Sequence, residues 1–128
     1  MPLEQAAGRL PYRDFFFSQG PLMPRVYGLL SPFWAPFGVA GGRALTALLG
    51  LCGAVLAAWL AARGAPSGRR LACAATAFLL TAGNVYHAYF TTIPKTYALA
   101  SLLLLAGVAA LWQPSGPRAA WRAGLGGL

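Results

Sequence analysis

The chain has 128 residues, of which 58% are hydrophobic and only 9% are charged. Soluble domains average about 25% charged residues, so this composition excludes an ordinary soluble domain and favours a membrane protein. The formal net charge of +8 does not predict nucleic-acid binding, because the arginines stand mostly at the ends of apolar stretches, where they would meet lipid phosphates.

The N-terminal segment is polar to amphipathic and contains both acidic residues of the chain, Glu4 and Asp14. It lacks the apolar core of a signal peptide. Residues 21–42 are apolar and aromatic, but four prolines interrupt them, and proline breaks a helix. Within them, residues 25–34 combine arginine and aromatic residues with leucines, which predicts a short helix lying in the membrane interface. We expect residues 1–41 to form a non-cytoplasmic loop that includes this interfacial helix.

Three long apolar stretches follow, at residues 44–62, 71–94 and 96–117, and none contains an acidic residue, lysine or arginine. Each is about long enough to cross a hydrocarbon core of roughly 30 Å at a rise of about 1.5 Å per residue. A charge at the centre of such a helix would cost roughly 2.5–3.5 kcal/mol. The sequence therefore predicts an all-α integral membrane protein that spans the cell membrane several times. It would have about three transmembrane helices, preceded by the short interfacial helix.

Glycine and proline residues, which break helices, set the expected helix limits within a transmembrane region covering residues 42–113. We expect helices at about 42–62, 69–90 and 94–113, with the glycine- and proline-rich turn before residue 70 joining the first two. Small residues recur four apart in the first helix, which would let another helix approach closely, although an alanine-rich composition gives the same pattern. Residues 114–128 resemble a cytoplasmic loop leading to a further helix that the sequence does not contain.

The orientation of these helices does not follow from charge alone. Lysine and arginine divide equally between the two sides, so the positive-inside rule does not decide. A preceding helix that carries the first loop across the membrane would resolve the conflict.

Two segments gather polar and aromatic residues, although the sequence has no Ser-His-Asp set, metal-ligand cluster or phosphate-binding glycine loop. They cover residues 11–22 and 84–97, and both would lie on the non-cytoplasmic side. Aromatic rings there could stack on a sugar, while lysine or arginine could neutralise a phosphate. The candidate site residues are Asp14, Gln19, Tyr86, His87, Lys95 and Tyr97.

Each of these residue types also has an ordinary structural explanation. Tyrosines such as Tyr86 commonly form the aromatic belt of a membrane protein. His87 could be a hydrogen-bonded residue at a helix end, and Asp14 a solvated partner of Arg13. Lys95 could extend its ammonium group from a helix end to the interface.

Three segments, in this order, resemble membrane glycosyltransferases of the C-type fold. They are GRLPYRDFFFSQGPLMPRVYGLL (Gly8–Leu30), GGRALTALLGLCGAVLAAWLAARG (Gly41–Gly64) and YHAYFTTIPKTYALASLLLLAGVAAL (Tyr86–Leu111). The likeness is to the bacterial branch near the dolichyl-phosphate-mannose protein mannosyltransferases and the lipid A aminoarabinose transferases. It covers nearly the whole chain. It implies an internal fragment that starts after the first helix of such an enzyme and stops near the fifth.

The resemblance implies transfer of a sugar from a polyprenyl-phosphate donor to an acceptor outside the cytoplasm. Asp14 matches a second acidic position of the family's loop, with a role in orienting substrate or a divalent cation, and Lys95 falls where a basic residue lies near the lipid phosphate. The family's general base should lie upstream of Met1, since the neighbours of Glu4 do not match the catalytic motif. The expected partners are membrane lipids, the polyprenyl-phosphate-sugar donor and the other transmembrane helices of the intact enzyme. The fragment alone is expected to be inactive.

Two other functions fit the same composition. A small non-catalytic three-helix subunit or assembly partner would use its small-residue faces to bind other helices. A piece of a transporter is disfavoured, because charged residues inside the membrane usually mark a transport path and are almost absent here.

Overall fold

The computed structural model describes residues 7–10, 12–14, 16 and 21–112. In this part of the chain every regular element is a helix and no strand is present, which confirms the all-α class. The elements are α2 (Leu22–Leu29), α3 (Ser31–Trp34), the 3₁₀ helix η1 (Ala35–Phe37), α4 (Gly38–Gly64), the 3₁₀ helix η2 (Ser67–Arg69), α5 (Arg70–Ala82), α6 (Val85–Thr92) and α7 (Thr96–Leu111).

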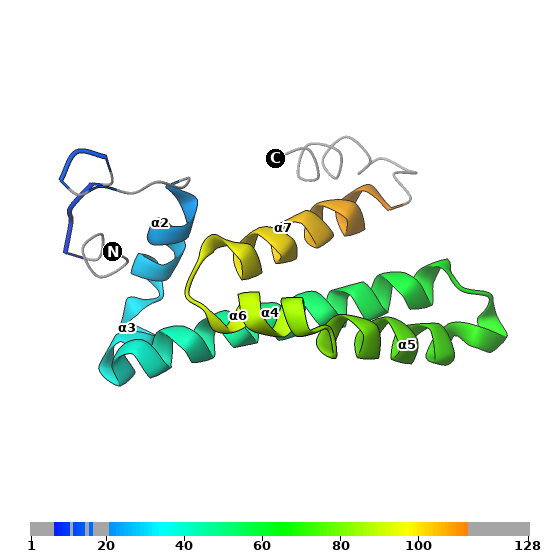
Figure 1. The fold of residues 1–128 in the computed structure, drawn as a ribbon. Helices are drawn as coiled ribbons and strands as arrows, with labels where there is room; N and C mark the ends of the chain where they lie inside the picture. Colours follow the sequence, from blue (N-terminus) through cyan, green and yellow to red (C-terminus); the bar gives the residue numbers. More distant parts are fainter. Residues whose placement is uncertain (1–6, 11, 15, 17–20, 113–128) are drawn as a thin grey trace.

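The longest helix, α4, is the centre of the fold (Figure 1). Helix α5 runs back beside it after the turn that contains η2, and α6 and α7 also pack against it. The two short helices α2 and α3 lie at the end where α4 begins. Because α4 contacts α3, α5, α6 and α7, it positions every other long element of the chain.

The prediction of one continuous helix over residues 69–90 is wrong. Helix α5 ends at Ala82, and the backbone leaves the helical conformation at Asn84 before α6 begins. Glycine is a poor helix former, and Asn84 has extended backbone angles (φ −72°, ψ 120°). The Asn84 side chain accepts a hydrogen bond from the backbone N–H of His87 at 3.1 Å. Asn84 therefore caps a new helix instead of continuing the old one.

The other helix limits differ from the expected ones at their ends. Helix α4 begins at Gly38, four residues before the predicted start, and Gly38 has a positive φ of 58° that favours glycine. Helix α7 begins at Thr96, because Pro94 and Lys95 remain outside the helix. Its last helical residue is Leu111, and residue 113, at which the predicted helix ends, lies outside the described residues.

The best-buried side chains join α2 to α4 and α7. Met23, Tyr27, Trp34 and Leu99 form one apolar cluster. The Trp34 indole N–H donates to the Tyr27 carbonyl at 2.8 Å, which ties α3 back onto α2. The aromatic residues of the expected interfacial segment, residues 25–34, thus include two that point into the fold rather than outward.

A pair of glycines allows α3 to cross the start of α4. A Cβ atom at Gly41 would collide with the backbone carbonyl of Trp34. A Cβ atom at Gly42 would contact the Trp34 ring at 3.7 Å and Pro94 at 3.8 Å. The chain before α4 and the link before α7 therefore meet over this glycine pair.

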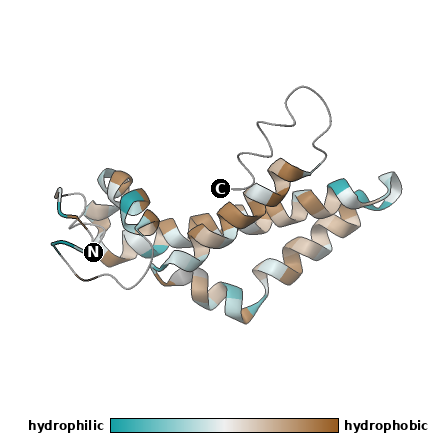
Figure 2. Cartoon of the chain, turned by 90° about the horizontal axis from the view of Figure 1, so that it is seen from above, coloured by the Kyte–Doolittle hydropathy of each residue, from teal (hydrophilic) through white to brown (hydrophobic). Residues whose placement is uncertain are grey.

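In the part of the chain that the structure describes, one helical run, Ser31–Gly64, is long and apolar enough to cross a membrane by length and composition. Helix α7 is apolar but shorter, with 16 residues. Hydrophobic residues run along α4 and α7, whereas the turn between α4 and α5 is hydrophilic (Figure 2). Helix length alone therefore does not show the three predicted spans. The second predicted span is divided into α5 and α6, and the third, α7, is short.

Candidate functional site

Asp14 closes a turn in the N-terminal segment. Its carboxylate accepts hydrogen bonds from Arg13 Nε at 2.8 Å and from a second Arg13 nitrogen at 3.0 Å. The backbone N–H of Leu10 donates to the same carboxylate at 2.8 Å, and the Asp14 N–H donates to the Leu10 carbonyl at 2.9 Å. The hydrogen bonds from Arg13 and Leu10 lower the pKa of Asp14 to about 2. Asp14 is therefore ionised at neutral pH and already paired.

The Asp14 turn does not fit the divalent cation that the resemblance allows. Both carboxylate oxygens already accept hydrogen bonds, and the Arg13 guanidinium supplies a neighbouring positive charge. Among the described residues, no group of three histidine, cysteine, aspartate or glutamate side chains could hold a metal ion. Hard divalent cations bind through several oxygen ligands, so no step is assigned to a metal here.

Four other candidate residues, Tyr86, His87, Lys95 and Tyr97, lie within residues 84–97, which we call the α6–α7 corner. Asn84 starts α6, and the rings of Tyr89, Phe90 and Tyr97 follow one another across the corner. The Tyr89 and Phe90 centroids are 5.2 Å apart, and those of Phe90 and Tyr97 are 4.8 Å apart, both with edge-to-face geometry. Such aromatic pairs hold α6 against the start of α7.

Lys95 occupies the N-cap position of α7 with an extended backbone and is exposed. Its backbone N–H donates to the Ile93 carbonyl at 2.7 Å, which tightens the link between the helices. The N-terminus of a helix carries a partial positive charge. The Lys95 ammonium group and the start of α7 therefore form one electropositive position suited to an anion.

The remaining predicted residues have different surroundings. Tyr86 is 76% exposed on α6, whereas His87 is partly buried. Tyr97 is 44% exposed, and its ring contacts that of Phe90. Gln19 lies outside the described residues.

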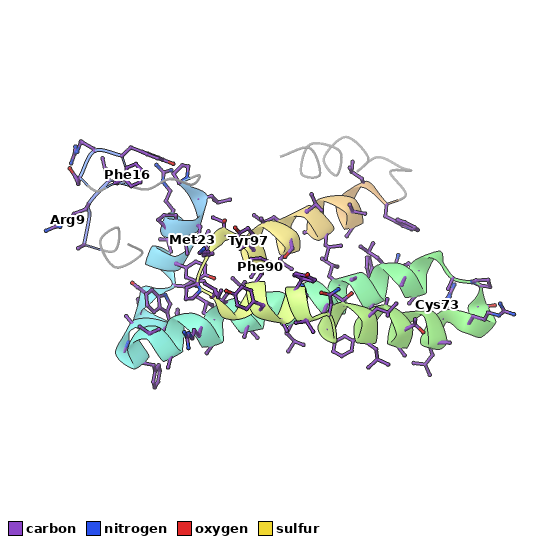
Figure 3. The ribbon with its side chains drawn as sticks, viewed as in Figure 1. Arg9, Phe16, Met23, Cys73, Phe90 and Tyr97 are labelled. Atoms are coloured by element: carbon purple, nitrogen blue, oxygen red, sulfur yellow. The ribbon has the colours of Figure 1, made fainter. Side chains whose placement is uncertain are left out.

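The α6–α7 corner and α2 meet at the same end of the molecule, since Leu99 of α7 packs with Met23 of α2. Figure 3 shows Met23, Phe90 and Tyr97 at this end and Cys73 at the opposite end. The N-terminal segment with Arg9 and Phe16 extends beyond α2, away from Tyr97 in this view. Tyr86, His87, Lys95 and Tyr97 thus lie on α6, on α7 and in the link between these helices, while Arg9 and Phe16, on either side of Asp14 in the sequence, lie beyond α2 (Figure 3).

Two arrangements were not predicted from the sequence. Tyr27, Thr46 and Trp34 form a buried polar network, although aromatic residues in that segment were expected at the membrane interface. The Arg63 guanidinium lies over the Trp59 ring, 4.5 Å from its centroid. The spacing of four residues between tryptophan and arginine on one helix could have indicated this second contact.

Comparisons with protein-family models, with curated proteins and with solved structures gave no match to this chain.

Proposed function

We propose that this chain is a multi-pass membrane part of a glycosyltransferase that uses a polyprenyl-phosphate-linked sugar. The placement in a membrane is supported by the run Ser31–Gly64, because only 22% of its most apolar 18-residue window is buried within the chain. A core helix of a soluble protein would bury most of such a window. Helix α4, the α5–α6 pair and α7 would supply three crossings.

The observation that carries the proposed activity is the position of Lys95 at the start of α7, two residues before Tyr97, whose ring contacts that of Phe90. Lysine and the helix N-terminus together favour a phosphate group. The partly exposed Phe90 and Tyr97 rings offer an apolar surface against which a sugar could lie. The corner therefore combines a positive charge that suits the phosphate of the donor with aromatic rings that suit its sugar.

The proposed reaction is displacement at the anomeric carbon of the sugar. The acceptor oxygen forms the new glycosidic bond, the bond to the lipid phosphate breaks, and a carboxylate takes the acceptor proton. Lys95 and the N–H groups of α7 would stabilise the negative charge on the departing phosphate.

Asp14 would position substrate instead of acting as the base. A carboxylate with a pKa of about 2 accepts a proton poorly near neutral pH, since general bases work best with a pKa near the working pH. Asp14 and Arg13 form a solvated ion pair in which the two charges neutralise each other. This pair could form hydrogen bonds with hydroxyl groups of the substrate. The proton acceptor of the reaction would then be a different carboxylate of the enzyme.

The membrane placement is tested by carbonate extraction of the expressed chain and by labelling single cysteines introduced at the two ends of α4. Retention in the membrane pellet and labelling from opposite sides are expected. Extraction into the soluble fraction would contradict the placement.

Donor binding is tested with the purified chain in nanodiscs and a polyprenyl-phosphate sugar. We expect K95Q to weaken binding about five-fold, the effect of about one interfacial cation, and R43Q, which removes an exposed arginine from α4, to leave binding unchanged. Equal binding by the parent chain and K95Q would show that Lys95 does not take part in donor binding. Transfer would be measured in the enzyme encoded by the whole gene, where D14A and K95A should each lower turnover sharply.

The alternative of a non-catalytic subunit is supported by the exposed leucines of α5. Leu71, Leu79 and Leu80 are 83%, 67% and 70% exposed, so this helix has an apolar surface open to a partner or to lipid. The small residues of α4 are less suited to that role than expected, because Gly50, Gly53 and Ala54 are buried within the chain. Site-specific photo-crosslinking from Leu79 to a distinct membrane protein, together with no donor binding, would favour this function.

A further inference from the structure

A second feature of the structure begins on α7 after the α6–α7 corner and contains none of the corner's residues. An apolar groove of about 610 Å³ runs between α4 and α7. Its lining residues are Leu51, Cys52, Val55, Leu56, Trp59, Leu102 and Ala109. On α4 these positions follow one stripe of the helix, and they extend over about 12 Å at a rise of about 1.5 Å per residue.

The chemistry of the groove excludes a polar small molecule. Its walls offer no charged group and no hydroxyl or amide side chain that could orient one. Ligand sites for polar molecules normally include a few placed polar groups. The α4 wall of the groove belongs to the run Ser31–Gly64, which is long and apolar enough to cross a membrane, so an apolar chain from the surrounding lipid is the chemically matched occupant.

One end of the groove carries positive charge. Trp59 lines the groove, and the Arg63 guanidinium lies over its ring at 4.5 Å. A guanidinium stacked on a ring keeps its N–H donors in the plane of the group, directed outward, where they can bind phosphate. Arg69 and Arg70 follow in the next turn and are exposed, and no acidic residue occurs after Asp14.

We propose that the groove binds an acyl chain of an anionic phospholipid, whose phosphate is held by Arg63 at the edge of the membrane. The apolar stripe of α4 and α7 accommodates the chain, and the Arg63–Trp59 pair marks the depth at which the head group lies. Trp59 serves both parts, because its ring lines the groove and supports the cation. This inference rests on the membrane placement proposed above and does not depend on sugar transfer.

The test is native mass spectrometry of the purified full chain in detergent with equal amounts of dioleoyl phosphatidylglycerol and dioleoyl phosphatidylcholine. We expect the anionic lipid to be retained about five-fold more than the zwitterionic one, the ratio contributed by about one interfacial cation. R63Q should reduce this preference to near equality. R43Q removes an arginine from the same helix away from the groove and should keep the preference.

A second pair of variants tests the groove itself. A109F places a ring in the groove and should lower retention of both lipids, whereas L104F adds a ring at a position of α7 that is 72% exposed and should not. Circular dichroism confirms that each variant keeps its helix content. Unchanged retention by A109F, or equal retention of both lipids by the parent chain, would overturn the proposal. A change from dimer to monomer in A109F without loss of lipid would show that a second copy of the chain fills the groove.

Carbonate extraction separates this failure from failure of the membrane placement. A parent chain that stays in the membrane but shows no lipid preference contradicts only the groove proposal. A chain that is extracted contradicts the membrane placement on which the groove proposal rests.

Discussion

The phenolic oxygen of Tyr27 lies 2.9 Å from Oγ1 of Thr46, and both side chains are fully buried. Thr46 Oγ1 also donates to the Gly42 carbonyl at 2.7 Å. A threonine hydroxyl has one hydrogen, so the Tyr27 hydroxyl must be the donor to Thr46. This directed chain of hydrogen bonds fixes α2 on α4 and, through Trp34, fixes α3 as well.

Replacing Thr46 by valine should destabilise the contact between α2 and α4. The variant keeps the shape of the side chain but leaves the buried Tyr27 hydroxyl without its acceptor, at a cost of about 1–3 kcal/mol. The free energy of unfolding would be measured by denaturant titration in detergent. T76V, at an exposed position of α5, is the matched control and should be nearly neutral. Equal stability of T46V and T76V would mean that the hydrogen bond contributes little.

A methyl group at Gly41 should be tolerated poorly, because it would meet the Trp34 backbone carbonyl, which cannot rotate away as a side chain can. We expect G41A to lose about 1–3 kcal/mol, typical of overpacking in a close-packed site. G53A provides the comparison in the same helix, since its new Cβ would lie 4.0 Å from Leu105. It should be neutral or more stable by up to about 1 kcal/mol from improved helix propensity. A G41A chain as stable as G53A would contradict the close crossing of α3 and α4.

The Asp14 turn should open in acid. Arg13 and the Leu10 N–H hold the pKa of Asp14 at about 2, below the ordinary value of 3.8. A lowered pKa in the folded turn means that the interaction is fully present above the ordinary pKa and is lost as the pH falls through the folded value. The turn should therefore weaken between about pH 4 and pH 2.

Carboxyl NMR of the chain labelled with ¹³C-aspartate measures this titration. R13Q should raise the pKa of Asp14 toward 3.8, and D14N should abolish the pH-dependent change in the Leu10 amide. A parent chain in which Asp14 titrates at its ordinary value would contradict the paired turn.

Removing the cap of α6 should loosen the α6–α7 corner. N84A deletes the acceptor of the His87 N–H, and loss of such a cap costs about 1 kcal/mol. Hydrogen exchange of the first α6 amides should become faster, while N84D should retain most of the protection because aspartate is also a good N-cap. Equal exchange in N84A and the parent chain would show that Asn84 is not needed for the start of α6.

The apolar sequence pattern predicted the long elements better than their limits. Charge-free runs indicated α4 and α7, because helices and apolar stretches of that length coincide. The same pattern could not locate the break before Val85, since hydrophobicity continues through it. Gly83 and Asn84 were visible signals, but whether a glycine and a capping residue end a helix depends on tertiary packing.

The sequence pattern did not predict which way the aromatic side chains point. An arginine- and aromatic-containing segment has the same composition whether its rings face lipid or another helix, so the burial of Tyr27 and Trp34 required the structure. The α6–α7 corner was easier to anticipate, because Tyr86, His87, Lys95 and Tyr97 lie within 12 positions of the chain. The sequence also placed Arg13 beside Asp14, but only the geometry shows that both carboxylate oxygens accept hydrogen bonds.

The unequal lengths of the helices have a consequence for the surrounding bilayer. At about 1.5 Å per residue, the 27 residues of α4 and the 16 residues of α7 extend over about 40 Å and about 24 Å respectively. A hydrocarbon core of about 30 Å is thinner than the first and thicker than the second, so the proposed membrane placement requires α4 to tilt and the lipid beside α7 to thin. Local bilayer thickness would then differ between the two faces of this one chain, and membranes of different lipid chain length would favour different tilts of α4.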